Sequence, residues 1–173
     1  MIGRRRWFER TFDLGHQVEM FPDVLESLRG TAPRLEEAVG ALGRDTLVKR
    51  VDDGWTIQEN VGHLYDLEPL WAGRLDDLLN EENSLRPADL SNEQTYQAKH
   101  NEREISDLLA SFRAIRLDIT GRLEGLTEEQ LHLESFHPRL ELPMTAVDLF
   151  FFVAEHDDHH LARITEIVRR SEG

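Results

Sequence analysis

The sequence contains no cysteine among its 173 residues. This absence excludes disulfide bonds, thiolate nucleophiles, zinc ribbons and cysteine-ligated iron–sulfur clusters. Any metal ion in this protein must therefore be bound by histidine, aspartate or glutamate side chains.

Long hydrophobic runs are also missing. The longest is LFFFVA, residues 149–154, whereas a membrane-spanning helix needs roughly 18 or more apolar residues. The start, MIGRRRWFERTFDLG, has charged residues where a signal peptide has its apolar core. We therefore expect a cytoplasmic protein that does not bind membranes.

Basic residues are few, because 20 lysines and arginines face 34 aspartates and glutamates, for a formal net charge of −14. Such a charge opposes binding to nucleic acid and to anionic lipid. The small basic patch at Arg4 to Arg6 is interpreted as a solvated terminus, so no nucleic-acid partner is expected. The length suits a single domain that spans residues 1–173.

The hydrophobic residues that are present recur at helical spacing in four long segments, and capping boxes open at Thr56 and Thr127. The segments are approximately residues 21–42, 57–78, 102–124 and 145–170. Gly30 and Pro33 are expected to break or kink the first of them. The pattern predicts an all-α four-helix bundle with long connections.

Three segments lack a helical pattern. Residues 1–20 carry Trp7, Phe8 and Phe12 among charged residues, which predicts an N-terminal arm that packs on the body or on a second subunit. Residues 80–100 are polar and predict a long excursion near a binding site, with a short helix after Ser91. Residues 132–144 contain two prolines and are expected to be irregular.

The last helical segment places two histidines, His156 and His160, on its apolar face. Their i,i+4 spacing brings the Cβ atoms to roughly 5–6 Å from each other, so both rings can bind one metal ion. His159 points about 100° away from that face. Composition alone predicts about 0.4 such spacings by chance. Two interpretations therefore remain open: a metal site, or core histidines that are hydrogen-bonded to carboxylates such as Asp157.

Two stretches resemble the DinB-like superfamily of four-helix bundles: WTIQENVGHLYDLEPLW, residues 55–71, and FFVAEHDDHHLARI, residues 151–164. In that family three histidines bind a divalent metal ion. By motif, the resemblance implies His63 in GHLYDLE, and His156 and His160 in HDDHH. The implied ion is zinc or nickel, which both suit histidine ligands.

The resemblance also implies a metal-dependent enzyme, because relatives include thiol-dependent S-transferases and isomerases, and others that look more like hydrolases. The metal would keep an open coordination position, with a low-molecular-weight thiol as a possible further cofactor and a small molecule as substrate. Candidates for a general base are Glu68, Asp157 and Glu59. Each of these carboxylates could instead orient a histidine or remain a surface charge.

A second hypothesis is a non-catalytic metal-binding homodimer with a role in stress response or interaction. Phe151 and Phe152 are predicted to point away from the core, and exposed aromatic pairs often mark a partner surface. A symmetric homodimer would bury this pair, together with the N-terminal arm.

Overall fold

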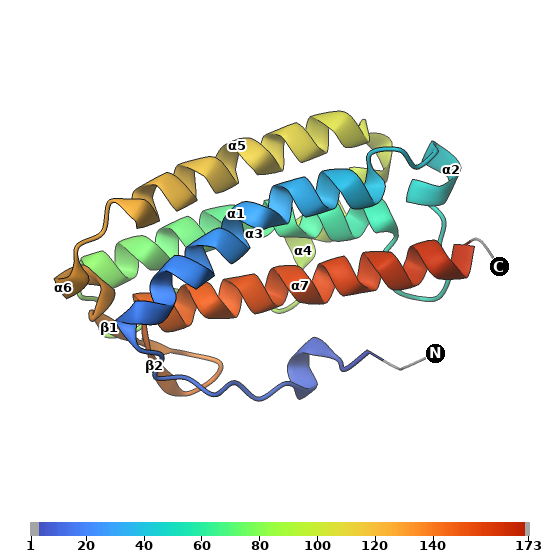
Figure 1. Cartoon of the computed structure of the whole chain (residues 1–173). Coiled ribbons are helices and arrows are strands. Elements are labelled where there is room, and N and C mark those ends of the chain that lie inside the picture. The colour runs from blue at the N-terminus through green and yellow to red at the C-terminus, as the bar shows by residue number, and fades with distance from the viewer. Residues whose placement is uncertain (1–3, 172–173) are drawn as a thin grey trace.

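The computed structural model describes residues 4–171 and consists mainly of four long helices. They are α1 (Phe21–Val39), α3 (Ile57–Leu79), α5 (Ile105–Glu124) and α7 (Ala146–Ser171). Both α1 and α3 pack against α5 and α7, so α1 and α3 occupy opposite corners of the bundle (Figure 1). This arrangement confirms the predicted four-helix bundle. None of the described helices is long and apolar enough to cross a membrane.

The two helices that carry the predicted metal ligands have well-defined starts. The hydroxyl of Thr56 accepts a hydrogen bond from the backbone N–H of Glu59, whose carboxylate accepts one from the backbone N–H of Thr56. Thr145 and Asp148 make the same reciprocal pair at the start of α7. These caps fix where each helix begins, and therefore which side chains face the bundle interior.

The expected break in the first helix is wrong. α1 runs without interruption through Gly30 and Pro33, and α3 likewise continues past Pro69. In α1 the buried face includes Leu28, Ala32, Leu35 and Val39, which lie on both sides of the proline. Burial of this continuous apolar face against α5 and α7 outweighs the roughly 3 kcal/mol by which an interior proline disfavours a helix.

Several short elements connect the long helices. They are the 3-10 turns η1 (Trp7–Glu9), η2 (Val18–Met20) and η3 (His100–Glu102), and the short helices α2 (Arg44–Leu47), α4 (Glu93–Gln97) and α6 (Glu128–Leu131). α4 confirms the short helix that was predicted after Ser91, within the long excursion between α3 and α5.

The segment 132–144 is not irregular as expected. It contains an antiparallel hairpin of β1 (Glu134–His137) and β2 (Leu142–Thr145), in which Pro143 pairs with Phe136. Proline is tolerated there because both strands of a two-stranded ribbon are edge strands. Glu141 adopts a left-handed conformation, with φ of 55°, next to β2. His137 is the last residue of β1.

The buried apolar residues form two clusters, one around Leu28, Leu75 and Phe150 and the other around Leu35 and Phe112. Charged side chains are buried as well. Arg116 of α5 donates hydrogen bonds of 2.9 and 2.6 Å to the carboxylate of Glu68 of α3. It also donates one of 2.5 Å to Asp157 of α7, which accepts a further hydrogen bond from Thr31 of α1. One polar side chain from each long helix thus meets inside the bundle.

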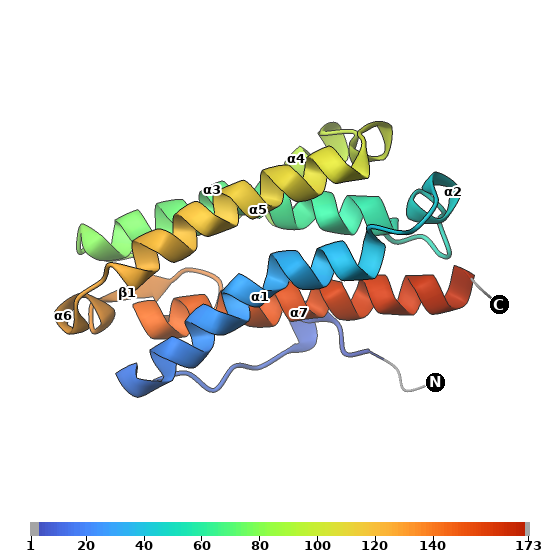
Figure 2. The ribbon, with the colours of Figure 1, turned by 45° about the horizontal axis from the view of Figure 1, so that its top comes forward.

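The N-terminal segment 4–20 lies along α7 (Figures 1 and 2). Asp148 anchors it, since its Oδ1 accepts hydrogen bonds from the backbone N–H groups of Gly15 and His16 at 2.9 and 3.0 Å. Closer to the N-terminus, Trp7 packs against Phe152 with ring centroids 5.0 Å apart. The segment therefore packs on the body of its own chain.

The predicted exposure of Phe151 and Phe152 is wrong. Phe152 is only 3% exposed, and Phe151 is half-buried with its ring 4.3 Å from that of His16. A helical wheel places both rings outside the bundle, but it cannot show that residues 4–20 cover this face of α7.

Candidate metal centre

His63 of α3 and His156 and His160 of α7 converge at the interface between the two helices. One ring nitrogen from each lies within 4.8 Å of the corresponding nitrogens of the other two. All three side chains are buried. The structure thus brings together the three histidines that the sequence motif selects, and it leaves His159 outside this set.

The ring of His63 is oriented by the hydroxyl of Thr95, which is itself hydrogen-bonded to the carboxylate of Asp66. Its Nδ1 lies 3.1 Å from Oγ1 of Thr95, and that hydroxyl donates its proton to Oδ2 of Asp66 at 2.9 Å. Because the hydroxyl has only one proton, it must accept from Nδ1–H of His63. The lone pair of His63 is then on Nε2, which is free to bind a metal ion.

Gly62 leaves the space that this chain of hydrogen bonds needs. Nε2 of His100 lies 2.8 Å from Oδ2 of Asp66, so His100 holds the carboxylate from its other side. A Cβ atom on Gly62 would lie 2.2 Å from Cγ of His100. In the GH pair of the motif, His63 is therefore the candidate ligand, and Gly62, which has no side chain, leaves room for His100.

His160 is oriented by the side-chain amide of Asn60. The amide nitrogen donates to the backbone carbonyl of Thr56 at 2.7 Å, which points the amide oxygen toward Nδ1 of His160 at 2.9 Å. Nδ1 must therefore carry the proton, and the lone pair of His160 is on Nε2.

His156 has the least satisfied ring of the three. Its Nδ1 is buried and has no hydrogen-bond partner among residues 4–171. Trp7 and Trp71 pack edge-on against the ring, with centroids at 4.9 and 5.9 Å. An unpartnered buried polar atom costs about 1–3 kcal/mol.

The three rings are neutral at physiological pH. Burial lowers the pKa of His63 to about 4. Burial likewise holds the pKa values of His156 and His160 well below 6.5, and the neighbouring histidines lower them further. Neutral imidazoles with free lone pairs are the form that binds divalent metal ions. The residues present therefore fit a divalent ion.

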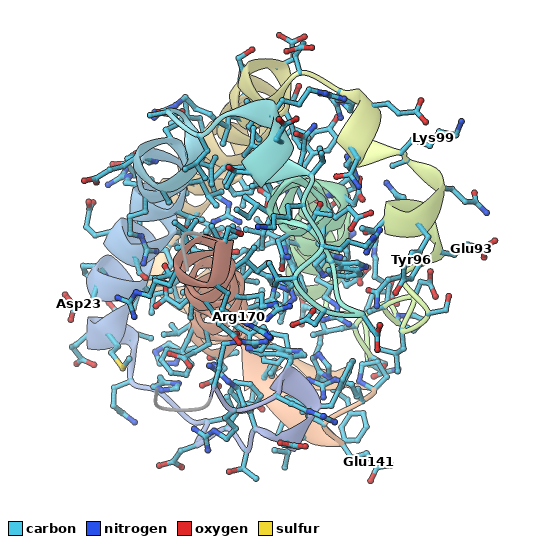
Figure 3. All side chains as sticks on the ribbon, turned by 90° about the vertical axis from the view of Figure 1, so that its right-hand side faces the viewer. Asp23, Glu93, Tyr96, Lys99, Glu141 and Arg170 are labelled. Carbon is cyan, nitrogen blue, oxygen red and sulfur yellow. The ribbon has the colours of Figure 1, made fainter. Side chains whose placement is uncertain are left out.

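The three histidines line a cavity of about 850 Å³. The aromatic residues of its wall include Trp7, Trp55, Trp71 and Phe152. The long excursion contributes residues from Pro87 to Tyr96, as expected of a segment near a binding site. Seen along the bundle, α4 with Tyr96 lies on the α3 side, and the N-terminal segment lies below α7 (Figure 3). The excursion and the arm thus both border the cavity.

Sequence comparison gives the chain its family. The DinB superfamily pattern matches residues 13–164, which include all three histidines. This chain belongs to the DinB superfamily. The family assignment confirms the resemblance carried by the motifs around His63, His156 and His160.

YfiT of Bacillus subtilis is similar to this DinB-superfamily chain. The two sequences are 27% identical over 157 residues, covering 89% of this chain and 85% of YfiT. The solved structure of YfiT is described as a probable metal-dependent hydrolase with an unusual four-helix bundle topology. It superposes with a TM-score of 0.80 at 26% identity and covers 95% of this chain and 94% of the YfiT chain.

A more distant likeness is to a mycothiol-dependent maleylpyruvate isomerase. The superposition has a TM-score of 0.64 at 12% identity, and it covers 82% of this chain and 59% of the isomerase chain. A histidine-to-alanine mutant of the isomerase gives a TM-score of 0.63 at 13% identity, with the same coverage of both chains. At this identity the likeness concerns the fold alone.

None of the three carboxylates that were considered as general bases lines the cavity. Glu68 and Asp157 both pair with Arg116 inside the bundle. Glu59 caps α3 and accepts hydrogen bonds from Arg50 and Asn101. The geometry gives each of them a structural partner, and it does not support their role as a base.

Sequence reasoning missed several residues of this DinB-superfamily site. His159 is buried despite its direction on the wheel, because Arg4 of the N-terminal segment contacts its ring nitrogens at 2.7 and 3.0 Å. Arg74, His137 and Arg139 line the cavity from α3 and the hairpin. The one available signal was HPRLELPM, residues 137–144, which resembles segments of some family members.

Proposed function

We propose that this protein is a metal-dependent hydrolase that binds a divalent ion through His63, His156 and His160. The observation that carries the proposal is the convergence of three buried, neutral imidazoles on the wall of a cavity large enough for a small molecule. The similarity to YfiT, a probable metal-dependent hydrolase, supports the same class of activity.

Three protein ligands are typical of catalytic sites, because structural zinc sites are usually closed by four. A bound divalent ion would supply Lewis-acid chemistry, polarising a substrate carbonyl and lowering the pKa of a water molecule. The chain itself does the positioning. Thr95 and Asn60 hold the rings of His63 and His160 with Nε2 free.

The aromatic residues of the cavity wall also affect the chemistry. Trp55 lies 4.5 Å from the ring of His63, and Trp7 lies 4.9 Å from that of His156, measured between centroids. These indole rings restrict the access of bulk water, which strengthens electrostatic interactions in the cavity. An uncharged substrate portion next to the scissile bond would pack on the same rings.

The metal-binding part of the proposal is tested by elemental analysis of protein purified without an affinity tag. We expect about one zinc or nickel ion per chain, and loss of that ion in the variant His63→Ala. His159→Ala is the matched control, because His159 is buried beside His160 and lines the same cavity but lies outside the three-histidine cluster. Metal content that survives His63→Ala would contradict the proposed ligand set.

Activity is tested separately with the metal-loaded protein and a panel of simple esters and amides. Hydrolysis by the wild type that disappears in His156→Ala is the expected result. If both proteins show the same background rate, the hydrolase assignment is wrong. Adding low-molecular-weight thiols with electrophilic substrates tests the thiol-dependent transfer that the family resemblance implies.

The alternative, a metal-binding homodimer without turnover, stays a prediction. The exposed aromatic pair that suggested it is not present, because Phe152 is buried under residues 4–20 of the same chain. Light scattering at micromolar concentration would test it directly, since a monodisperse monomer would contradict the dimer.

A further inference from the structure

The cavity has a charge opposite to that of the protein as a whole. The chain has a net charge of −14, yet the cavity wall holds more arginines than carboxylates. The arginines are Arg4, Arg6, Arg74, Arg139 and Arg163, and the acidic residues are Asp52, Asp89 and Glu166.

The three acidic residues already have partners. Asp52 pairs with Arg163 at 2.6 Å, and Glu166 pairs with Arg163 at 3.0 Å and with Arg4 at 3.5 Å. Asp89 accepts hydrogen bonds from the backbone N–H groups of Ser91 and Glu93 at the start of α4. None of these carboxylates is therefore available to Arg74 or Arg139.

Arg74 is buried, with 2% of its surface exposed, and forms no ion pair with any carboxylate of residues 4–171. The nearby Asp77 is bound to Arg86 by hydrogen bonds of 2.7 to 3.2 Å. Arg74 donates from Nε to the backbone carbonyl of Arg86, and its Nη1 lies 3.0 Å from Nε2 of His137. Burial, with a contribution from Arg139, lowers its pKa to about 10, so it is still charged at neutral pH.

More hydrogen-bond donors face the ring of His137 than it has acceptor nitrogens. Nδ1 of His137 faces the backbone N–H groups of Arg139 and Leu140 at 3.3 and 3.2 Å, while Nε2 faces Arg74. A neutral imidazole has only one acceptor nitrogen, and burial keeps His137 neutral by lowering its pKa to about 4. One of the two sides therefore lacks an acceptor.

Arg139, in the turn of the hairpin, is the second arginine of the cavity wall without a carboxylate partner among the described residues. Its guanidinium lies over the rings of Phe8 and Phe152, with Cζ 5.4 and 5.7 Å from the ring centroids. Its Nη2 is buried and has no hydrogen-bond partner among residues 4–171. A buried guanidinium N–H group without an acceptor favours an anion, because charged hydrogen bonds gain strength away from water.

We propose that Arg74 and Arg139 form a subsite for an oxyanionic group of the substrate, a carboxylate or a phosphate. The subsite and the metal centre are neighbours through Trp71, because Cζ of Arg74 lies 5.5 Å from the Trp71 ring centroid, which lies 5.9 Å from that of His156. The substrate class is thus a small anionic molecule whose charged end binds at Arg74 and Arg139 and whose scissile bond reaches the three histidines. This use of the subsite rests on the proposed function, whereas the binding of an anion does not.

The test uses metal-free protein, so that no anion can bind through a metal ion. All three tryptophans of the chain, Trp7, Trp55 and Trp71, line the cavity, and their fluorescence reports occupancy. The probes are benzoate, phenyl phosphate and benzamide, which share a ring and differ in the group attached to it. We expect one or both anions to bind at least about tenfold more tightly than the neutral, nearly isosteric benzamide.

Two variants locate the binding. Arg139→Gln and Arg74→Gln are each expected to weaken anion binding about ten- to a hundredfold and to leave benzamide binding unchanged. Arg139 is on the hairpin and only half-buried, so its variant remains informative if Arg74→Gln does not fold. Arg113→Gln is the matched control, because Arg113 pairs with Glu36 on the outside of the bundle.

Three results would overturn the subsite: equal affinity for benzoate, phenyl phosphate and benzamide, no anion binding at about 10 mM, or wild-type anion affinity in a folded Arg139→Gln variant. A preference for benzoate identifies a carboxylate, and a preference for phenyl phosphate identifies a phosphate. Because no metal is present in this test, metal content that survives His63→Ala, or equal background hydrolysis by wild type and His156→Ala, would overturn the proposed function without affecting this result.

Discussion

Replacing Arg116 by methionine is expected to destabilise the protein by about 3–5 kcal/mol, which is typical for removing one partner of a buried ion pair. Glu68 and Asp157 are both fully buried, and Arg116 is their only cationic partner among the described residues. Asp157 would retain a hydrogen bond from Thr31, whereas Glu68 would keep none of the hydrogen bonds described for its side chain. For a chain of this length the loss corresponds to a fall in Tm of roughly 10 °C.

The measurement is urea unfolding of metal-free wild type and variant, followed by circular dichroism. Arg113→Met is the control, because Arg113 lies on the same helix and its pair with Glu36 has both side chains 39% exposed. An exposed pair of this kind contributes at most about 1 kcal/mol. A deficit in Arg116→Met no larger than that in Arg113→Met would refute the reasoning.

The pH dependence of this deficit gives a second check. Burial already raises the pKa of Glu68, and loss of Arg116 would raise it further. A carboxyl whose pKa is higher in the folded state stabilises the fold below the unfolded pKa, and this contribution is lost as the pH rises through the folded pKa. The difference between Arg116→Met and wild type should therefore be larger at pH 8 than at pH 5. A difference that is independent of pH would contradict an unpaired buried carboxylate as its cause.

Three further predictions concern the site. Thr95→Val removes the hydroxyl that orients His63 and should weaken metal binding about 10- to 100-fold in a chelator competition, while Thr165→Val, on the exposed side of α7, should not. Gly62→Ala would force a Cβ against His100 and should lower Tm, whereas Gly121→Ala, with open space around its Cα, should leave it unchanged or raise it. The pKa of His137 is about 4 in the folded protein, so as the pH falls the unfolded chain takes up this proton before the folded chain does. The contribution of His137 to stability should therefore be constant above pH 6.5 and should fall by roughly 3 kcal/mol between pH 6.5 and 4. Urea unfolding across this range should show a shallower fall in His137→Gln, and equal slopes would contradict the assignment.

Much of the fold followed from local patterns. Apolar residues at helical spacing predicted the four long helices, and the capping boxes at Thr56 and Thr127 were found where expected. The motifs around His63, His156 and His160 selected the three side chains that converge. The helices and their starts were predictable because helical periodicity and caps are encoded within a few residues of each other, whereas the three-histidine set was implied by the family resemblance.

The failures involve contacts between distant segments. Pro33 did not break α1, because burial against α5 and α7 outweighs the local preference. The hairpin escaped prediction because its prolines do not oppose it: Pro138 lies in the turn, and Pro143 pairs within a two-stranded ribbon. Glu68 was considered as a general base, but it is paired with Arg116, which lies 48 positions further along the chain.

The sequence alone determined the helices and the pairing of His156 with His160 on one face, because these depend on spacing along single helices, and the family resemblance added His63. Only the tertiary structure decided that residues 4–20 cover Phe152 and His159, that Glu68 and Asp157 face Arg116, and that Arg74 and Arg139 lack carboxylate partners within the described residues. Burial, and with it the pKa of each group, is set by side chains that arrive from elsewhere in the chain. The electrostatics of the cavity therefore become visible only when the helices, the hairpin and the N-terminal segment are packed together.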